Sequence, residues 1–121
     1  MTRRDVQLKA RESGKPWDLG KNFEQSAVLS DISIDYQGKL LNEGCIELKV
    51  NGVTKQSANL NSLIWNIAEI IEDLSKFYHL QPGDLIYTGT PEGVGAVIGG
   101  DRIDGSIASV GQISLNINYS D

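Results

Sequence analysis

The sequence CIELKVNG at residues 45–52 carries the clearest structural signal in the chain. Its apolar side chains at positions 46, 48 and 50 alternate with polar ones, which is typical of a strand that buries one face. Asn51 and Gly52 favour a two-residue hairpin turn, because both residue types tolerate a positive φ. The sequence therefore predicts a β-hairpin whose returning strand covers residues 53–58.

Further strands are expected on both sides of this hairpin. Residues 27–36 alternate in their second half, and residues 37–39 (QGK) favour a turn. Residues 85–88 (LIYT) predict a short buried strand. The final strands are expected at residues 101–105 and 113–119, so the chain should be mainly β.

One long helix is predicted over residues 61–78. Apolar residues recur there every three or four positions, so one wide stripe would face a core. Asn61 or Ser62 can cap the start of this helix. His79, the single histidine, would lie at its end, where a cation is favourable.

A second, shorter helix is predicted over residues 2–12. Thr2 can cap its start, and the Gly and Pro of residues 13–16 (SGKP) would end it. Residues 17–26 show neither the helical nor the strand period, and they are expected to form a loop.

Length and composition point to one α+β domain over residues 1–121. The hydrophobic content of 40% is enough to build a core, and no run approaches the roughly 20 apolar residues of a membrane span. A single cysteine, Cys45, excludes a disulfide framework within the chain. No secretion signal is visible, so a cytoplasmic location is expected.

Charge is unevenly distributed along the chain, whose formal net charge is −5. Residues 1–21 hold six basic and three acidic side chains, and the remainder is strongly acidic. Acidic proteins bind nucleic acid poorly, because that affinity depends on neutralising phosphates. The basic stretch fits either a small anionic ligand or a solvated helix face. Neither nucleic acid nor a membrane is expected as a partner.

Two loops carry candidate site residues. Residues 89–95 (GTPEGVG) follow a predicted strand, and such a turn lets backbone N–H groups and a hydroxyl approach an anion. The same pattern also fits a tight strand connection. In the other loop, Gly20 and Phe23 would give Lys21 a partly apolar setting, in which its ammonium could stabilise an oxyanion. Neither loop has the spacing of a Walker or a dinucleotide motif.

Three segments taken together resemble the fumarylacetoacetate hydrolase family: residues 2–7 (TRRDVQ), 14–23 (GKPWDLGKNF) and 82–95 (PGDLIYTGTPEGVG). The branch they resemble contains acylpyruvases, oxaloacetate decarboxylases and catabolic isomerases. The resemblance covers essentially the whole chain. It implies that the chain is the C-terminal part of a catalytic domain built on a mixed β-roll. It also implies that the protein forms a homodimer or a higher assembly.

The resemblance also assigns roles to particular residues. Lys21 would be catalytic and would donate to the developing enolate or substrate oxygen. Gly89 and Thr90 would hold the substrate carboxylate, and Arg4 and Gln7 would line the pocket. The implied substrate is an acylpyruvate-like 2-oxo acid. Hydrolysis, decarboxylation and isomerisation share the enolate, so the reaction type stays open.

In this family three carboxylates hold Mg²⁺ or Mn²⁺, which polarises the substrate carbonyl. In relatives these ligands belong to a region before residue 1 of this sequence. The resemblance therefore implies a C-terminal half that binds no metal alone and is inactive alone. Two hypotheses follow: part of a metal-dependent carbon–carbon hydrolase, decarboxylase or isomerase in aromatic or 2-oxo acid catabolism, or a truncated fragment that acts only as a folding or dimerisation module.

Overall fold

The computed structural model describes residues 1–33 and 41–119, which fall into two compact units. Unit 1 is Met1–Ile32 and unit 2 is Ser33–Asp121, and each is described by itself. The single domain over residues 1–121 stays a prediction. Within the described ranges, no helix has the length and apolar character needed to span a membrane.

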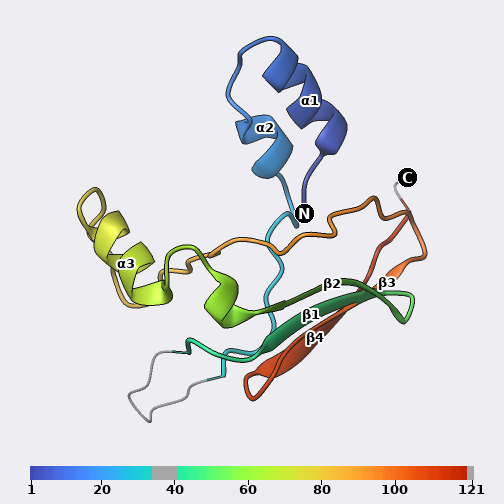
Figure 1. Cartoon of the computed structure of the whole chain (residues 1–121). Helices are drawn as coiled ribbons and strands as arrows, with labels where there is room; N and C mark the ends of the chain where they lie inside the picture. Colours follow the sequence, from blue (N-terminus) through green and yellow to red (C-terminus); the bar gives the residue numbers. More distant parts are fainter. Residues whose placement is uncertain (34–40, 120–121) are drawn as a thin grey trace. The chain divides into compact units, whose positions relative to one another are not determined.

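Unit 1 contains two helices, α1 (Arg4–Glu12) and α2 (Asp18–Lys21), shown in blue in Figure 1. Helix α1 confirms the predicted N-terminal helix, although its N-cap is Arg3 and makes no side-chain cap. Helix α2 replaces part of the loop expected at residues 17–26. A 2.7 Å hydrogen bond from the backbone N–H of Asn22 to the carbonyl of Asp18 closes this single turn.

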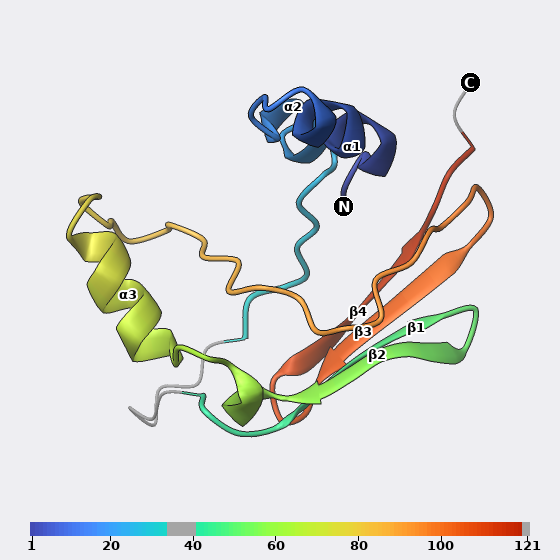
Figure 2. The same ribbon diagram turned by 45° about the horizontal axis from the view of Figure 1, so that its top comes forward.

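Unit 2 is built on a four-stranded antiparallel sheet with the order β2-β1-β3-β4 (Figures 1 and 2). Its strands are β1 (Cys45–Val50), β2 (Val53–Asn59), β3 (Arg102–Ile107) and β4 (Gly111–Asn116). The predicted hairpin is confirmed: β1 pairs with β2, and the turn residues Asn51 and Gly52 have φ angles of 52° and 77°. The α+β class is therefore confirmed, whereas the mixed β-roll stays a prediction.

Strand β2 contains a β-bulge that matters for the site described below. Leu48 pairs with Gln56 while the next residue, Lys49, pairs with Thr54, so Lys55 has no partner in the ladder. A bulge of this kind bends the strand and redirects the groups beside it. The sheet covers little core, since Ile103, at 6% exposure, is the one buried apolar side chain among the described residues.

The prediction of one long helix over residues 61–78 was wrong. Residues Leu60–Ser62 form a 3₁₀ turn, η1, and the α-helix α3 spans only Ile67–Ser75. It begins where it does because Asn66 and Glu69 form a reciprocal capping box at its N-terminus. The expected apolar stripe does not face a core: Ile71 is 39% exposed, and Phe77, beyond the helix end, is 74% exposed.

Two strand predictions also need correction. Residues 85–88 lie outside the four-stranded sheet and form no strand, and their apolar side chains are exposed. Figure 2 shows this part of the chain as an irregular connection between α3 and β3. The last strands were found near their expected places, at β3 and β4. Residues 27–33 form no strand, and residues 34–36 of the predicted strand and the predicted 37–39 turn lie outside the described residues.

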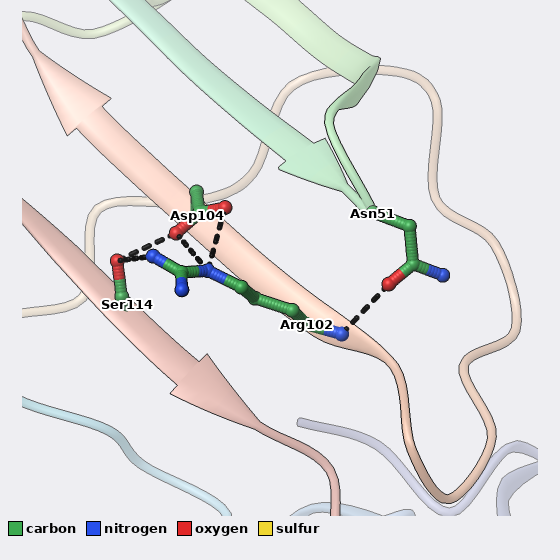
Figure 3. A network of polar contacts seen from close by, with 4 residues as sticks. All are labelled: Asn51, Arg102, Asp104 and Ser114. Carbon is green, nitrogen blue, oxygen red and sulfur yellow. Dashed lines mark hydrogen bonds and ion pairs between the residues drawn. The ribbon is translucent and has the colours of Figure 1, made fainter.

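A polar network joins the hairpin turn to β3 and β4 (Figure 3). The side-chain oxygen of Asn51 accepts a 2.9 Å hydrogen bond from the backbone N–H of Arg102. The guanidinium of Arg102 donates to Asp104 at 3.0 Å and to the hydroxyl of Ser114 at 3.3 Å. Ser114 donates to Asp104 at 2.5 Å. These hydrogen bonds hold the pKa of Asp104 below its ordinary value of 3.8, and the one from Ser114 has the largest effect.

Asp101 fixes the end of the segment that precedes β3. Its carboxylate accepts hydrogen bonds from the side-chain amide of Asn51 at 2.8 Å and from the backbone N–H of Ile98 at 2.9 Å. These two hydrogen bonds lower the pKa of Asp101 below its ordinary value of 3.8, and the one from Ile98 has the largest effect. The hairpin turn therefore anchors the far end of the loop that carries residues 89–95.

Acid should weaken unit 2 through these two carboxylates. Both have a lower pKa in the folded chain than in the unfolded chain, so their stabilising effect is present above about pH 4 and is lost as the pH falls through their folded values. We expect the melting temperature to fall from about pH 5 downward, and to fall less steeply in Asp104→Asn. Circular dichroism melts at several pH values measure both slopes. Identical slopes for the parent and the variant would contradict this assignment.

Candidate functional site

Unit 2 contains a groove of about 510 Å³ between the sheet, the start of α3 and the glycine-rich loop. Ile46 of β1, Leu63 and Trp65 supply much of its apolar wall. Polar side chains also line it, and on the loop side the lining comes from Thr88, Gly89 and Thr90; the other polar lining residues are Asn59 and Ser62. Two residues predicted to bind substrate, Gly89 and Thr90, therefore line one groove.

Gln56 attaches this loop to the sheet. Its side chain, only 9% exposed, extends from β2, and its amide nitrogen makes two hydrogen bonds to the loop. One is to the backbone carbonyl of Pro91 at 2.7 Å, and the other is to the hydroxyl oxygen of Thr90 at 3.2 Å. Gln56 was not among the predicted site residues, because a polar residue in a predicted strand gives no signal of a contact with a loop more than 30 residues away.

Gly93 brings the loop against the bulge of β2. Its φ angle is +97°, a conformation that side-chain-bearing residues rarely adopt. A Cβ atom at this position would clash with the carbonyl oxygen of Lys55 and lie 3.0 Å from its carbonyl carbon. The loop therefore needs glycine here both for its backbone conformation and for its close approach to the strand.

Unit 1 carries the other predicted site residues. The ammonium of Lys21 is exposed and donates a 2.9 Å hydrogen bond to the hydroxyl of Thr2. The expected apolar setting for Lys21 is not found, because the guanidinium of Arg3 lies over the Phe23 ring instead, 4.5 Å from its centroid. The exposed ammonium remains available to an anionic ligand.

Arg4 and Gln7 lie next to each other on α1, where the Arg4 guanidinium donates to the Gln7 side-chain oxygen at 3.2 Å. Gln7 is buried, at 7% exposure. Gly20, the residue before Lys21, packs on it so closely that a Cβ there would lie 3.1 Å from the Gln7 Cβ. The predicted residues thus form two groups, one in each unit.

The described residues do not fit a metal site of their own. Across residues 1–33 and 41–119, no three His, Cys, Asp or Glu side chains are grouped so that they could hold an ion. The described residues that line the groove are also uncharged, so hydrogen-bond donors are what they can offer to an anion.

Comparison with known proteins identifies the class of this chain. The family model described as "Fumarylacetoacetate (FAA) hydrolase C-terminal" matches residues 1–118. The chain therefore belongs to the fumarylacetoacetate hydrolase family, as the three sequence segments predicted.

Particular relatives fall in the fumarylpyruvate hydrolase and oxaloacetate tautomerase branch. The chain is 59% identical to the fumarylpyruvate hydrolase of Ralstonia sp over 117 residues, which are 97% of this chain and 60% of that protein. It is 38% identical to the mitochondrial oxaloacetate tautomerase of Rattus norvegicus over 122 residues, covering 99% of this chain and 54% of that protein.

A solved relative has nearly the same fold. The crystal structure of fumarylpyruvate hydrolase from Pseudomonas aeruginosa, in complex with Mn²⁺ and pyruvate, matches with a TM-score of 0.94 and 42% identity. The match covers 99% of this chain and 52% of that one. The chain thus spans about half the length of the relatives it matches.

Proposed function

We propose that this chain is the part of an acylpyruvate hydrolase that binds the 2-oxo acid end of the substrate, with fumarylpyruvate as the first candidate. The observation that carries the proposal is the groove beside Gly89 and Thr90, in a chain 59% identical to a fumarylpyruvate hydrolase. Decarboxylation and tautomerisation of related 2-oxo acids remain the alternative reactions, because they pass through the same enolate.

In this proposal the loop binds and unit 1 supplies charge. The hydroxyl of Thr90 and the backbone N–H groups of Gly89 and Thr90 hold the substrate carboxylate. Hydrolysis adds water to the acyl carbonyl carbon, breaks the bond from that carbon to the methylene group of the pyruvate part, and leaves the electron pair there as an enolate. The ammonium of Lys21 donates to the enolate oxygen, and Arg4 and Gln7 line the pocket.

A metal would stabilise that enolate further. One relative was crystallised with Mn²⁺, and we propose that the complete enzyme uses Mg²⁺ or Mn²⁺. Its carboxylate ligands would come from outside the described residues, which contain no group of side chains able to hold an ion.

The function is tested in a hybrid enzyme. In this hybrid, the chain replaces the 117 residues that it matches in the Ralstonia fumarylpyruvate hydrolase. We expect the hybrid to release pyruvate from fumarylpyruvate, and to do so only with Mg²⁺ or Mn²⁺. A folded hybrid with no activity towards fumarylpyruvate, oxaloacetate or other acylpyruvates would contradict the proposal.

A second candidate function is a folding or dimerisation module without activity of its own. The observation that favours it is the exposed apolar surface of unit 2, including Ile64 at 97% and Phe77 at 74% exposure. Surfaces of this kind promote association. Under this candidate function, the chain would act as a homodimer in the cytoplasm.

Two measurements on the isolated chain test its expected inactivity and the module candidate. We expect no turnover of fumarylpyruvate or oxaloacetate by the chain alone with added Mg²⁺, because the described residues provide no metal-ligand group. Light scattering on the same sample measures self-association, and a mass of one chain at high concentration would argue against the module. Turnover that a chelator and Lys21→Ala both abolish would overturn the prediction of inactivity.

A further inference from the structure

The acceptor at Pro91 fixes which way the Gln56 amide points. A backbone carbonyl can only accept hydrogen bonds, so the Gln56 atom that lies 2.7 Å from it must be the amide nitrogen. The same nitrogen lies 3.2 Å from the hydroxyl oxygen of Thr90. Both amide hydrogens are therefore directed at the loop, and the Thr90 oxygen is the acceptor.

This direction determines what the Thr90 hydroxyl can offer to a ligand. A hydroxyl has one hydrogen to donate and can accept through its lone pairs. Because its oxygen already accepts from Gln56, its hydrogen is left to point away from that amide. The described residues that line the groove are uncharged, so neutral donors such as this hydroxyl are what their side chains offer to a bound carboxylate.

We propose that Gln56 is a positioning residue that sets Thr90 as a hydrogen-bond donor towards the carboxylate of a 2-oxo acid. This inference rests on the proposed function, since it assumes that the carboxylate binds at Thr90. Gln56 itself does not touch the ligand. It acts from β2 through the Thr90 hydroxyl, and its low exposure protects the two hydrogen bonds from competition with water.

The test is a titration of the full chain with pyruvate, with the amide NMR signals of residues 88–95 as the readout. The variant Gln56→Glu keeps the size of the side chain but presents an oxygen that accepts the Thr90 hydrogen. We expect it to raise the Kd for pyruvate by roughly tenfold or more, the loss expected for one hydrogen bond to a charged group. Gln56→Met, which neither donates nor accepts comparably, should raise it less.

The Thr90→Val background separates positioning from other effects. If Gln56 acts through the hydroxyl, Gln56→Glu should change the Kd by less than about twofold once Thr90 is valine. Gln112→Glu, on the exposed edge strand β4, controls for the added charge and should bind pyruvate as the parent does.

Each outcome has one meaning. An undiminished effect of Gln56→Glu in the Thr90→Val background, or a larger effect of Gln56→Met, overturns the positioning role and leaves the proposed function standing. Pyruvate that shifts no signal in residues 88–95 of the parent chain overturns the substrate site and this inference together. Where Gln56→Glu fails to fold, Gln56→Met decides the matter: its effect on the Kd should disappear in the Thr90→Val background, and an undiminished effect overturns the positioning role.

Discussion

Replacing Lys21 with alanine in the hybrid enzyme should lower kcat about 100-fold to 1,000-fold, the usual cost of removing one donor that stabilises an oxyanion. The physical reason is that the variant would lack the ammonium that donates to the enolate oxygen in our proposal. A helical turn, α2, carries this ammonium. Because the side chain is exposed and its ammonium is held by a neutral partner, Thr2, it keeps donor capacity for a ligand. Steady-state release of pyruvate measures the effect.

Two control variants distinguish a catalytic loss from a structural one. Lys15→Ala removes an exposed lysine of the same unit and should leave kcat within about twofold. Thr2→Val removes the partner of the ammonium and should change kcat by only a few fold, because the charge stays. If Lys21→Ala retains more than about a third of the parent kcat, and Thr2→Val has about the same kcat as Lys21→Ala, then Lys21 is not the catalytic donor.

The sequence predicted most reliably the features that depend on near neighbours. The hairpin at Asn51 and Gly52 needs only a positive φ at two positions, and the structure has it. Helix α1 was likewise expected from its residues alone. The start of α3 could also have been found, because Asn66 followed three residues later by Glu69 is the sequence form of a capping box. The apolar run 63–65 before it concealed that signal.

Features that depend on distant partners were beyond the sequence. Residues 85–88 have the composition of a buried strand, but a strand exists only as part of a ladder, and the sheet of the described residues does not include them. The α3 stripe is apolar as predicted, yet apolar periodicity does not say whether a core covers it.

The candidate site shows the same division. The glycine-rich loop was proposed as a candidate from its own residues, whereas the strand residue that holds it, Gln56, was not. No local pattern could show that β2 carries a bulge at Lys55, or that this bulge lies against Gly93. The joint action of Lys21 and Thr90, which belong to different units, stays a prediction.

Gly93→Ala should be the most damaging single change in the loop. Alanine would have to adopt a φ of +97°, which costs about 1–3 kcal/mol, and its Cβ would clash with the backbone of Lys55. Backbone atoms of a paired strand cannot move aside as a flexible side chain does, so the loop must leave β2. That movement breaks the hydrogen bonds from Gln56 to Thr90 and Pro91, and the hybrid enzyme should lose at least about tenfold in kcat/KM.

Two other glycines of the same loop make matched controls. A Cβ on Gly95 meets nothing within 4 Å and its φ lies outside the left-handed region, so Gly95→Ala should behave as the parent. Gly89 has a φ of +136° but open space around a Cβ, so Gly89→Ala reports backbone strain without the clash. Thermal melts and kcat/KM should therefore rank Gly95→Ala as mildest. If Gly93→Ala lowers the melting temperature no more than Gly89→Ala does, backbone strain alone explains the loss of stability, and the close packing of the loop on the bulge does not stabilise the loop.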